Sequence, residues 1–94
     1  MSNSDPIVFS QNTDRARCYP AFGCSICWTR HAVQRVEERF GTSSELEIPN
    51  RKIVKAHEKV ADDEEFHVKT ALAEFVCKRD RQGCVVILTV LFAK

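Results

Sequence analysis

The chain has 94 residues, 44% of them hydrophobic and 29% charged, so it has room for one domain and lacks the composition of a disordered protein. Its formal net charge of +1 excludes the strong basic excess of many nucleic-acid-binding proteins, so any contact with phosphate must come from a local cluster of cations. The first residues lack the features of a secretory signal, and no apolar run approaches the about 20 residues that span a bilayer. We therefore expect a cytosolic protein without a membrane partner.

The first 28 residues predict an irregular, cysteine-containing segment, with a short edge strand at residues 7–9. A helix is then expected to begin with Ser25 or Thr29 as its N-cap and to end before Gly41, a favourable C′ residue. Its apolar residues recur on one side at helical spacing: Ala32, Val33, Val36 and Phe40.

A second helix is predicted to start near Pro49, because Pro is favoured in the first turn. The apolar residues that keep helical spacing there are Ile53, Val54, Val60 and Ala61. His57 shares their side of the helix. We interpret it as a partly buried histidine bonded to a backbone group, with a catalytic role as the alternative.

Residues 66–78 fit both a helix and alternating strand residues. We prefer strands, because residues 84–92 form a valine-rich apolar run typical of a buried strand, which needs partners on both sides. A loop at residues 81–83 would join the two. The expected fold is a single α+β domain over residues 1–94. In it, residues 29–94 form two helices packed on a three- or four-stranded antiparallel sheet, with the last strand central.

The cysteines allow a metal site. If the helix begins near Cys24, then Cys24, Cys27 and His31 share one face, and Cys18 supplies a fourth ligand for structural zinc. The alternative is that the cysteines are small apolar residues packed under the sheet, with no cofactor. A reducing compartment would keep them as thiols.

The segment from Thr29 to Gly41 contains His-Ala-x2-Arg-x2-Glu-Arg, and the chain ends with a valine-rich strand. This pattern resembles a loose group of small bacterial and phage proteins that is similar to the toxin ribonuclease superfamily of barnase, RelE-type toxins and colicin ribonucleases. The resemblance covers residues 29–94. It implies one or two helices packed on an antiparallel sheet, and a site at the motif residues His31, Arg35, Glu38 and Arg39.

The residue types suit RNA cleavage without a metal, which needs a base, an acid and cations that hold the phosphate. His31 can act as base or acid, Glu38 can orient it, and Arg35 and Arg39 can bind phosphate oxygens. His67 is the best second histidine. The alternative is a solvated helix face with internal ion pairs.

The function predicted first is therefore a toxin-like or phage-encoded endoribonuclease centred on His31. RNA would be its substrate, and a cognate protein or antitoxin its partner. The competing prediction is a noncatalytic interaction or regulatory module with a zinc- or thiol-stapled N-terminal segment.

Overall fold

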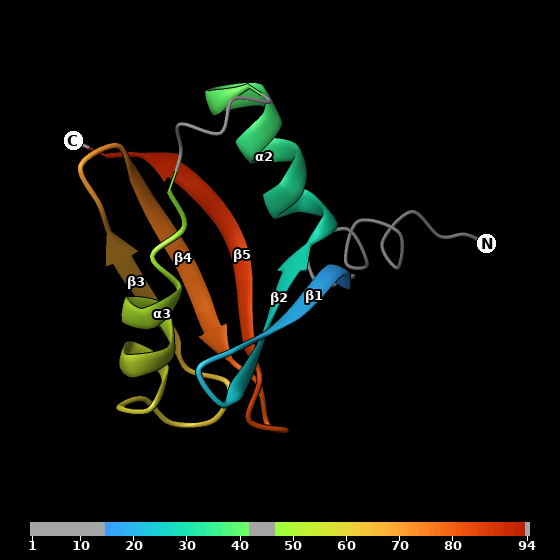
Figure 1. The fold of residues 1–94 in the computed structure, drawn as a ribbon, viewed down its shortest axis with the longest axis vertical. Coiled ribbons are helices and arrows are strands. Elements are labelled where there is room, and N and C mark those ends of the chain that lie inside the picture. Colours follow the sequence, from blue (N-terminus) through green and yellow to red (C-terminus); the bar gives the residue numbers. More distant parts are fainter. Residues whose placement is uncertain (1–14, 42–46, 94) are drawn as a thin grey trace.

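The structure is a computed structural model that describes residues 15–41 and 47–93. The strand predicted at residues 7–9 lies outside these ranges. In the described part of the chain, five strands form one sheet, and two helices pack with it (Figure 1). The elements are β1 (Arg15–Ala21), β2 (Cys24–Thr29), α2 (Arg30–Phe40), α3 (Asn50–His57), β3 (Glu65–Lys69), β4 (Ala73–Arg79) and β5 (Val85–Phe92).

The strand order across the sheet is β1-β2-β5-β4-β3, so β5 is central, as predicted. β2 runs parallel to β5, whereas the other neighbours are antiparallel. The α+β class with two helices is confirmed. The prediction of three or four antiparallel strands is corrected to a mixed sheet of five among the described residues, because the N-terminal segment adds two strands to it.

Residues 15–29 form a β-hairpin, whereas the sequence predicts an irregular segment there and the zinc hypothesis requires a helix that begins near Cys24. Phe22 and Gly23 are the two loop residues, with φ angles of 51° and 78°. Two-residue hairpin loops favour positive φ at both positions, which glycine adopts without strain. The side chains of Ile26 and Trp28 point to one face of the sheet and that of Cys27 between them to the other, as in any strand, and all three are buried.

Both ends of α2 agree with the prediction. Thr29 is the N-cap, and Gly41 follows the helix with a φ of 71°. The second helix is shorter than predicted, since α3 ends at His57, and Pro49 takes the N-cap position. The apolar spacing continues past this end, but Val60 lies in the turn that leads to β3.

Residues 66–78 form strands, as preferred, with a turn between β3 and β4. Phe66 and Val68 are buried while His67 is exposed, which is the alternation of an edge strand with one covered face. Residues 66–78 form strands rather than a helix because the buried strand β5 needs a hydrogen-bonded neighbour on each side, and β4 is one of them.

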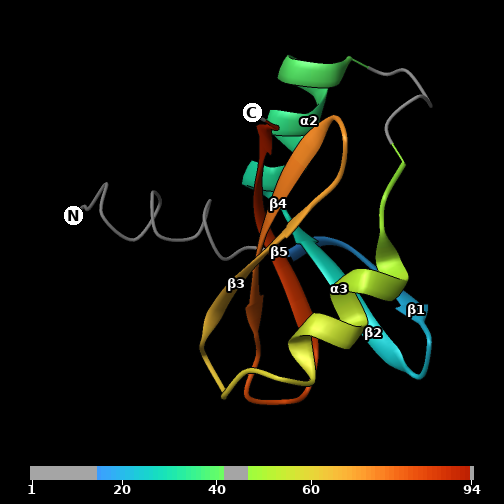
Figure 2. The same ribbon diagram turned by 90° about the vertical axis from the view of Figure 1, so that its left-hand side faces the viewer.

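The sheet has two faces with different cover. The first face packs against the helices and includes the fully buried side chains of Ile26, Phe75 and Ile87. The second face points away from α3 (Figure 2). The strand registers place Cys27, Val76 and His67 on it. No helix within the described ranges is both long enough and apolar enough to cross a membrane.

Candidate functional site

The helix that carries the predicted polar stripe, α2, starts where β2 ends (Figure 1). Thr29 is fully buried, and its Oγ1 accepts a hydrogen bond from the backbone N–H of Ala32 at 3.0 Å. The same hydroxyl donates to the carbonyl of Leu88 at 3.1 Å. These two bonds fix the first turn of α2 against β5. His31 lies in that turn, so the junction of strand and helix determines its position.

Four polar residues follow one side of α2 and together form the α2 stripe: His31, Arg35, Glu38 and Arg39. The guanidinium of Arg35 donates to the carboxylate of Glu38 at 2.6 Å. Partial burial lowers the pKa of His31 below 6.5, and the positive charges of Arg35 and Arg39 lower it further, against a smaller opposite effect of Glu38. These effects favour the neutral imidazole, which can accept a proton.

Arg39 contacts a backbone group. β2 pairs with β5 only as far as Ile87, so the described structure has no strand beside the later residues of β5 on that side. Leu88 and Val90 direct their carbonyls to this side, since carbonyls two residues apart in a strand point the same way. Arg39 Nη1 donates to the Val90 carbonyl at 2.7 Å. Arg39 thus holds α2 beside the unpaired edge of β5.

His67 belongs to a different cluster, on the second face of the sheet. Its Nδ1 lies 2.5 Å from a carboxylate oxygen of Glu74, and its Nε2 lies 3.6 Å from one of Glu65. β3 is the edge strand, with β4 and β5 between it and β2, and α2 packs on β5, β2 and β1. His67 therefore has two carboxylate neighbours, Glu65 and Glu74, and is not part of the α2 stripe.

The four predicted zinc ligands are not brought together. Cys18 and Cys27 are directly opposite in β1 and β2 and form a disulfide. Cys24 precedes Cys27 by three positions on a strand, so their side chains point to opposite faces, whereas on a helical turn they would have converged. His31 lies beyond the end of that strand. The described residues contain no group of three or more His, Cys, Asp or Glu side chains that could hold a metal ion, so the geometry gives the zinc hypothesis no support.

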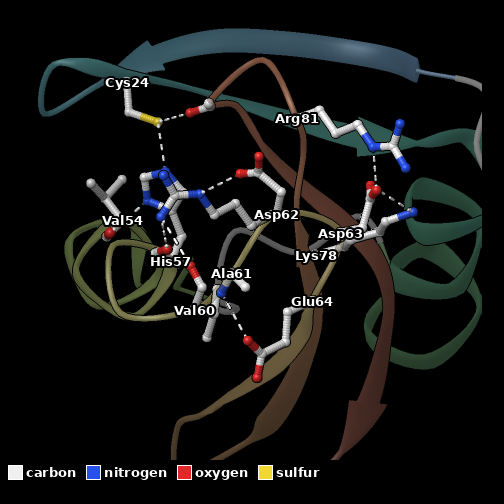
Figure 3. Close-up of polar contacts among 12 residues, drawn as sticks. Cys24, Val54, His57, Val60, Ala61, Asp62, Asp63, Glu64, Lys78 and Arg81 are labelled. Carbon is white, nitrogen blue, oxygen red and sulfur yellow. Dashed lines mark hydrogen bonds and ion pairs between the residues drawn. The ribbon is translucent and has the colours of Figure 1, made fainter.

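A contact between Cys24 and His57 was not predicted from the sequence (Figure 3). The Cys24 Sγ lies 3.8 Å from Nε2 of His57. Nδ1 of the same ring lies 2.8 Å from the carbonyl of Val54, which confirms the predicted buried histidine with a backbone partner. The thiol and the ring are 33 residues apart, so no local spacing could have indicated their contact.

A groove of about 470 Å³ lies between α2 and the β1–β2 hairpin. Val33, Val36 and Trp28 provide apolar walls. The indole N–H of Trp28 donates to the hydroxyl of Tyr19 at 3.1 Å, and that hydroxyl donates to Asn50 at 2.9 Å. These polar groups thus satisfy one another, and the groove by itself indicates no particular ligand.

Two arrangements in the described structure can perform chemistry: the α2 stripe, where a proton acceptor lies near cations, and the pair of Cys24 and His57, where a nucleophile faces a base. Comparisons of the chain with models of protein families, with curated proteins and with solved structures found no match. The chemistry is therefore inferred from the geometry of these residues.

Proposed function

We propose that this chain is a toxin-like or phage-encoded endoribonuclease that cleaves RNA without a metal, with His31 as its general base. The observation that carries the proposal is the placement of His31 beside the guanidinium groups of Arg35 and Arg39 on one side of α2, which brings a proton acceptor next to phosphate-binding cations. The helix motif and the packing of two helices with a sheet support it, because the resemblance implies both features.

The stripe supplies a base and a phosphate ligand. His31 takes the proton of a ribose 2′-hydroxyl, whose oxygen then attacks the adjacent phosphorus. Arg35 binds a non-bridging phosphate oxygen as negative charge increases there. Glu38, 2.6 Å from Arg35, orients the guanidinium. Arg39 is a positioning residue, because its contact with Val90 holds the helix in place and its charge favours the neutral form of His31.

The acid that protonates the departing 5′-oxygen is assigned to His67. Helical periodicity of about 100° per residue places His31 on the side of α2 that points away from the core. His67 lies on the second face of the sheet, in register with Val76 and then Thr89. Since neighbouring strands are about 4.8 Å apart, the backbone of His67 is about 10 Å from β5, and both histidine side chains must extend toward one phosphate, to which the attacking and the departing oxygen are both bonded. Glu74 fixes the orientation of the His67 ring through Nδ1.

The test uses purified protein, a mixed RNA pool and a chelator. We expect cleavage that leaves 2′,3′-cyclic phosphate ends. His31→Gln should lower the cleavage rate by a factor of at least about 100. Gln34→Ala is the matched control, because Gln34 is exposed on the same helix outside the stripe. It should cleave at the wild-type rate.

Absence of cleavage by the wild-type protein would reject the proposal, and so would equal rates for His31→Gln and Gln34→Ala. His67→Gln tests the acid separately. Full activity of that variant would remove His67 from the mechanism and leave the base assigned. Expression in a bacterial host should be toxic for the wild type and tolerated for His31→Gln, unless a cognate partner protein is present.

A second candidate function is a noncatalytic interaction module whose N-terminal hairpin is stapled by a thiol link. The disulfide between Cys18 and Cys27 favours the thiol form of this staple over the zinc form. Thiol titration of the unfolded, unreduced chain should then find three free thiols, which are Cys24, Cys77 and Cys84. Four or more free thiols would end this proposal, and RNA cleavage that depends on His31 would favour the enzyme.

A further inference from the structure

The thiol of Cys24 lies at the start of β2, near the end of α3 and the loop before β5 (Figure 3). Its Sγ is 3.8 Å from Nε2 of His57 and 3.3 Å from the carbonyl of Gly83. The residue is only partly buried, so small molecules can reach it. Cys24 is outside the α2 stripe, and the proposed function does not use it.

The ring of His57 is held with its base toward the thiol. His57 is 6% exposed, and its Nδ1 lies 2.8 Å from the carbonyl of Val54. A carbonyl can only accept a hydrogen bond, so Nδ1 carries the ring proton and Nε2 of the neutral ring presents a lone pair. Cys24 is the side chain that faces this lone pair.

Arg79 fixes the end of α3 that carries this ring. Its Nη1 donates to the carbonyls of His57 and Val60 at 3.1 and 3.0 Å. Its Nε lies 3.3 Å from a carboxylate oxygen of Asp62, which offsets part of its charge. The Val54 carbonyl orients the ring, so Cys24, His57 and this carbonyl provide the nucleophile, the base and the orienting group of an activated thiol.

We propose that Cys24 is a modification site, where the thiol, with His57 as base, reacts with low-molecular-weight disulfides. The thiol proton moves to Nε2 of His57, and the sulfur attacks one sulfur of the disulfide. A bond forms between Cys24 and that sulfur while the bond of the incoming disulfide breaks. The departing thiolate takes the proton from His57. The products are one mixed disulfide on the protein and one small thiol, with no net change of oxidation state.

The other free cysteines provide internal comparisons. Cys77 is fully buried, and burial raises its pKa to about 12, so it is inert at neutral pH. Cys84 is partly buried like Cys24, and its thiol has no histidine contact among those that the structure describes. A difference in rate between Cys24 and Cys84 therefore measures what His57 adds.

The experiment incubates the folded protein, with its Cys18 to Cys27 disulfide intact, with hydroxyethyl disulfide at pH 7. This probe is uncharged, so charge attraction does not affect its rate. Peptide mass spectrometry gives the rates at Cys24 and Cys84 in the same sample. A neighbouring base raises the thiolate fraction at neutral pH more than it lowers the nucleophilicity of the sulfur. We expect Cys24 to react about threefold faster than Cys84, and His57→Gln to remove this difference.

Equal rates at the two cysteines, or a Cys24 rate that His57→Gln leaves unchanged, would overturn the proposal. Should His57→Gln fail to fold, the pH dependence of the wild-type rate decides. A thiol paired with imidazole reaches a constant rate near neutral pH, whereas an isolated thiol gains about tenfold per pH unit up to its ordinary pKa. An isolated-thiol profile at Cys24 would also contradict the inference.

Discussion

Thr29→Val is the substitution that best tests how the fold positions the α2 stripe. Valine has almost the shape of threonine, so the buried site stays filled while the hydroxyl is lost. That hydroxyl makes two bonds in the structure, one with the N–H of Ala32 and one with the carbonyl of Leu88. The variant therefore removes the helix cap and leaves the Leu88 carbonyl without this donor.

The magnitude follows from these two losses. Removing an N-cap side chain costs about 1 kcal/mol, and an unmade bond to a partly buried carbonyl costs about 1 kcal/mol more. The free energy of unfolding should fall by about 2 kcal/mol. For a domain of this size, each kcal/mol lowers Tm by about 4 to 8 °C, so Tm should fall by about 8 to 16 °C.

Urea denaturation followed by circular dichroism measures the change, with Thr29→Ser as the matched control. Serine keeps both hydrogen bonds and loses one methyl group, which costs about 0.8 kcal/mol. The expected order of stability is wild type, then Thr29→Ser, then Thr29→Val. If serine destabilises as much as valine, the hydroxyl is not what stabilises the junction, and the reasoning is refuted.

Two further predictions concern charge and the disulfide. An NMR titration should give His31 a pKa below 6.5, and Arg35→Gln should raise it, since a nearby positive charge is removed; a pKa at or above 6.5 in the wild type would contradict the burial of the ring. The pKa of His31 is lower in the folded chain than in the unfolded chain, so the unfolded chain binds the proton first as the pH falls. The stability linked to His31 is therefore complete above about pH 6.5 and is lost as the pH falls through the pKa of the folded chain. Replacing Cys18 and Cys27 by alanine should lower the free energy of unfolding by about 3 kcal/mol, the value for a loop closed over a separation of 9 residues. A loss under about 0.5 kcal/mol in urea denaturation would show that the link contributes little.

The sequence predicted elements whose signals are local. α2 has a side-chain cap at Thr29 and a glycine at its end, and β5 is an apolar run that suits only a buried strand. The parallel pairing of β2 with β5 could not be predicted, because it joins residues about 60 positions apart and depends on the packing of everything between them.

The cysteine spacing shows why the site was harder to predict than the fold. On a helical turn the side chains of Cys24 and Cys27 would point the same way and could bind one metal ion, whereas on a strand they point to opposite faces of the sheet. The alternation of Ile26 and Trp28 favours the strand, yet only the presence of Cys18 opposite Cys27 decides the outcome. The disulfide also differs from the prediction that all the cysteines remain thiols, and a cytosolic location stays a prediction.

The parallel pair at the centre of the sheet has a kinetic consequence. Contacts such as the one from Thr29 to Leu88 close a loop of 59 residues. Long-range pairing of this kind is slow, because the entropy of loop closure must be overcome before the contacts are made. β5 is also the last of the described strands to leave the ribosome. The hairpin and both helices therefore cannot pack into a native core until β5 has been synthesised. Apolar surface on the nascent chain stays open to aggregation or chaperone binding during that interval.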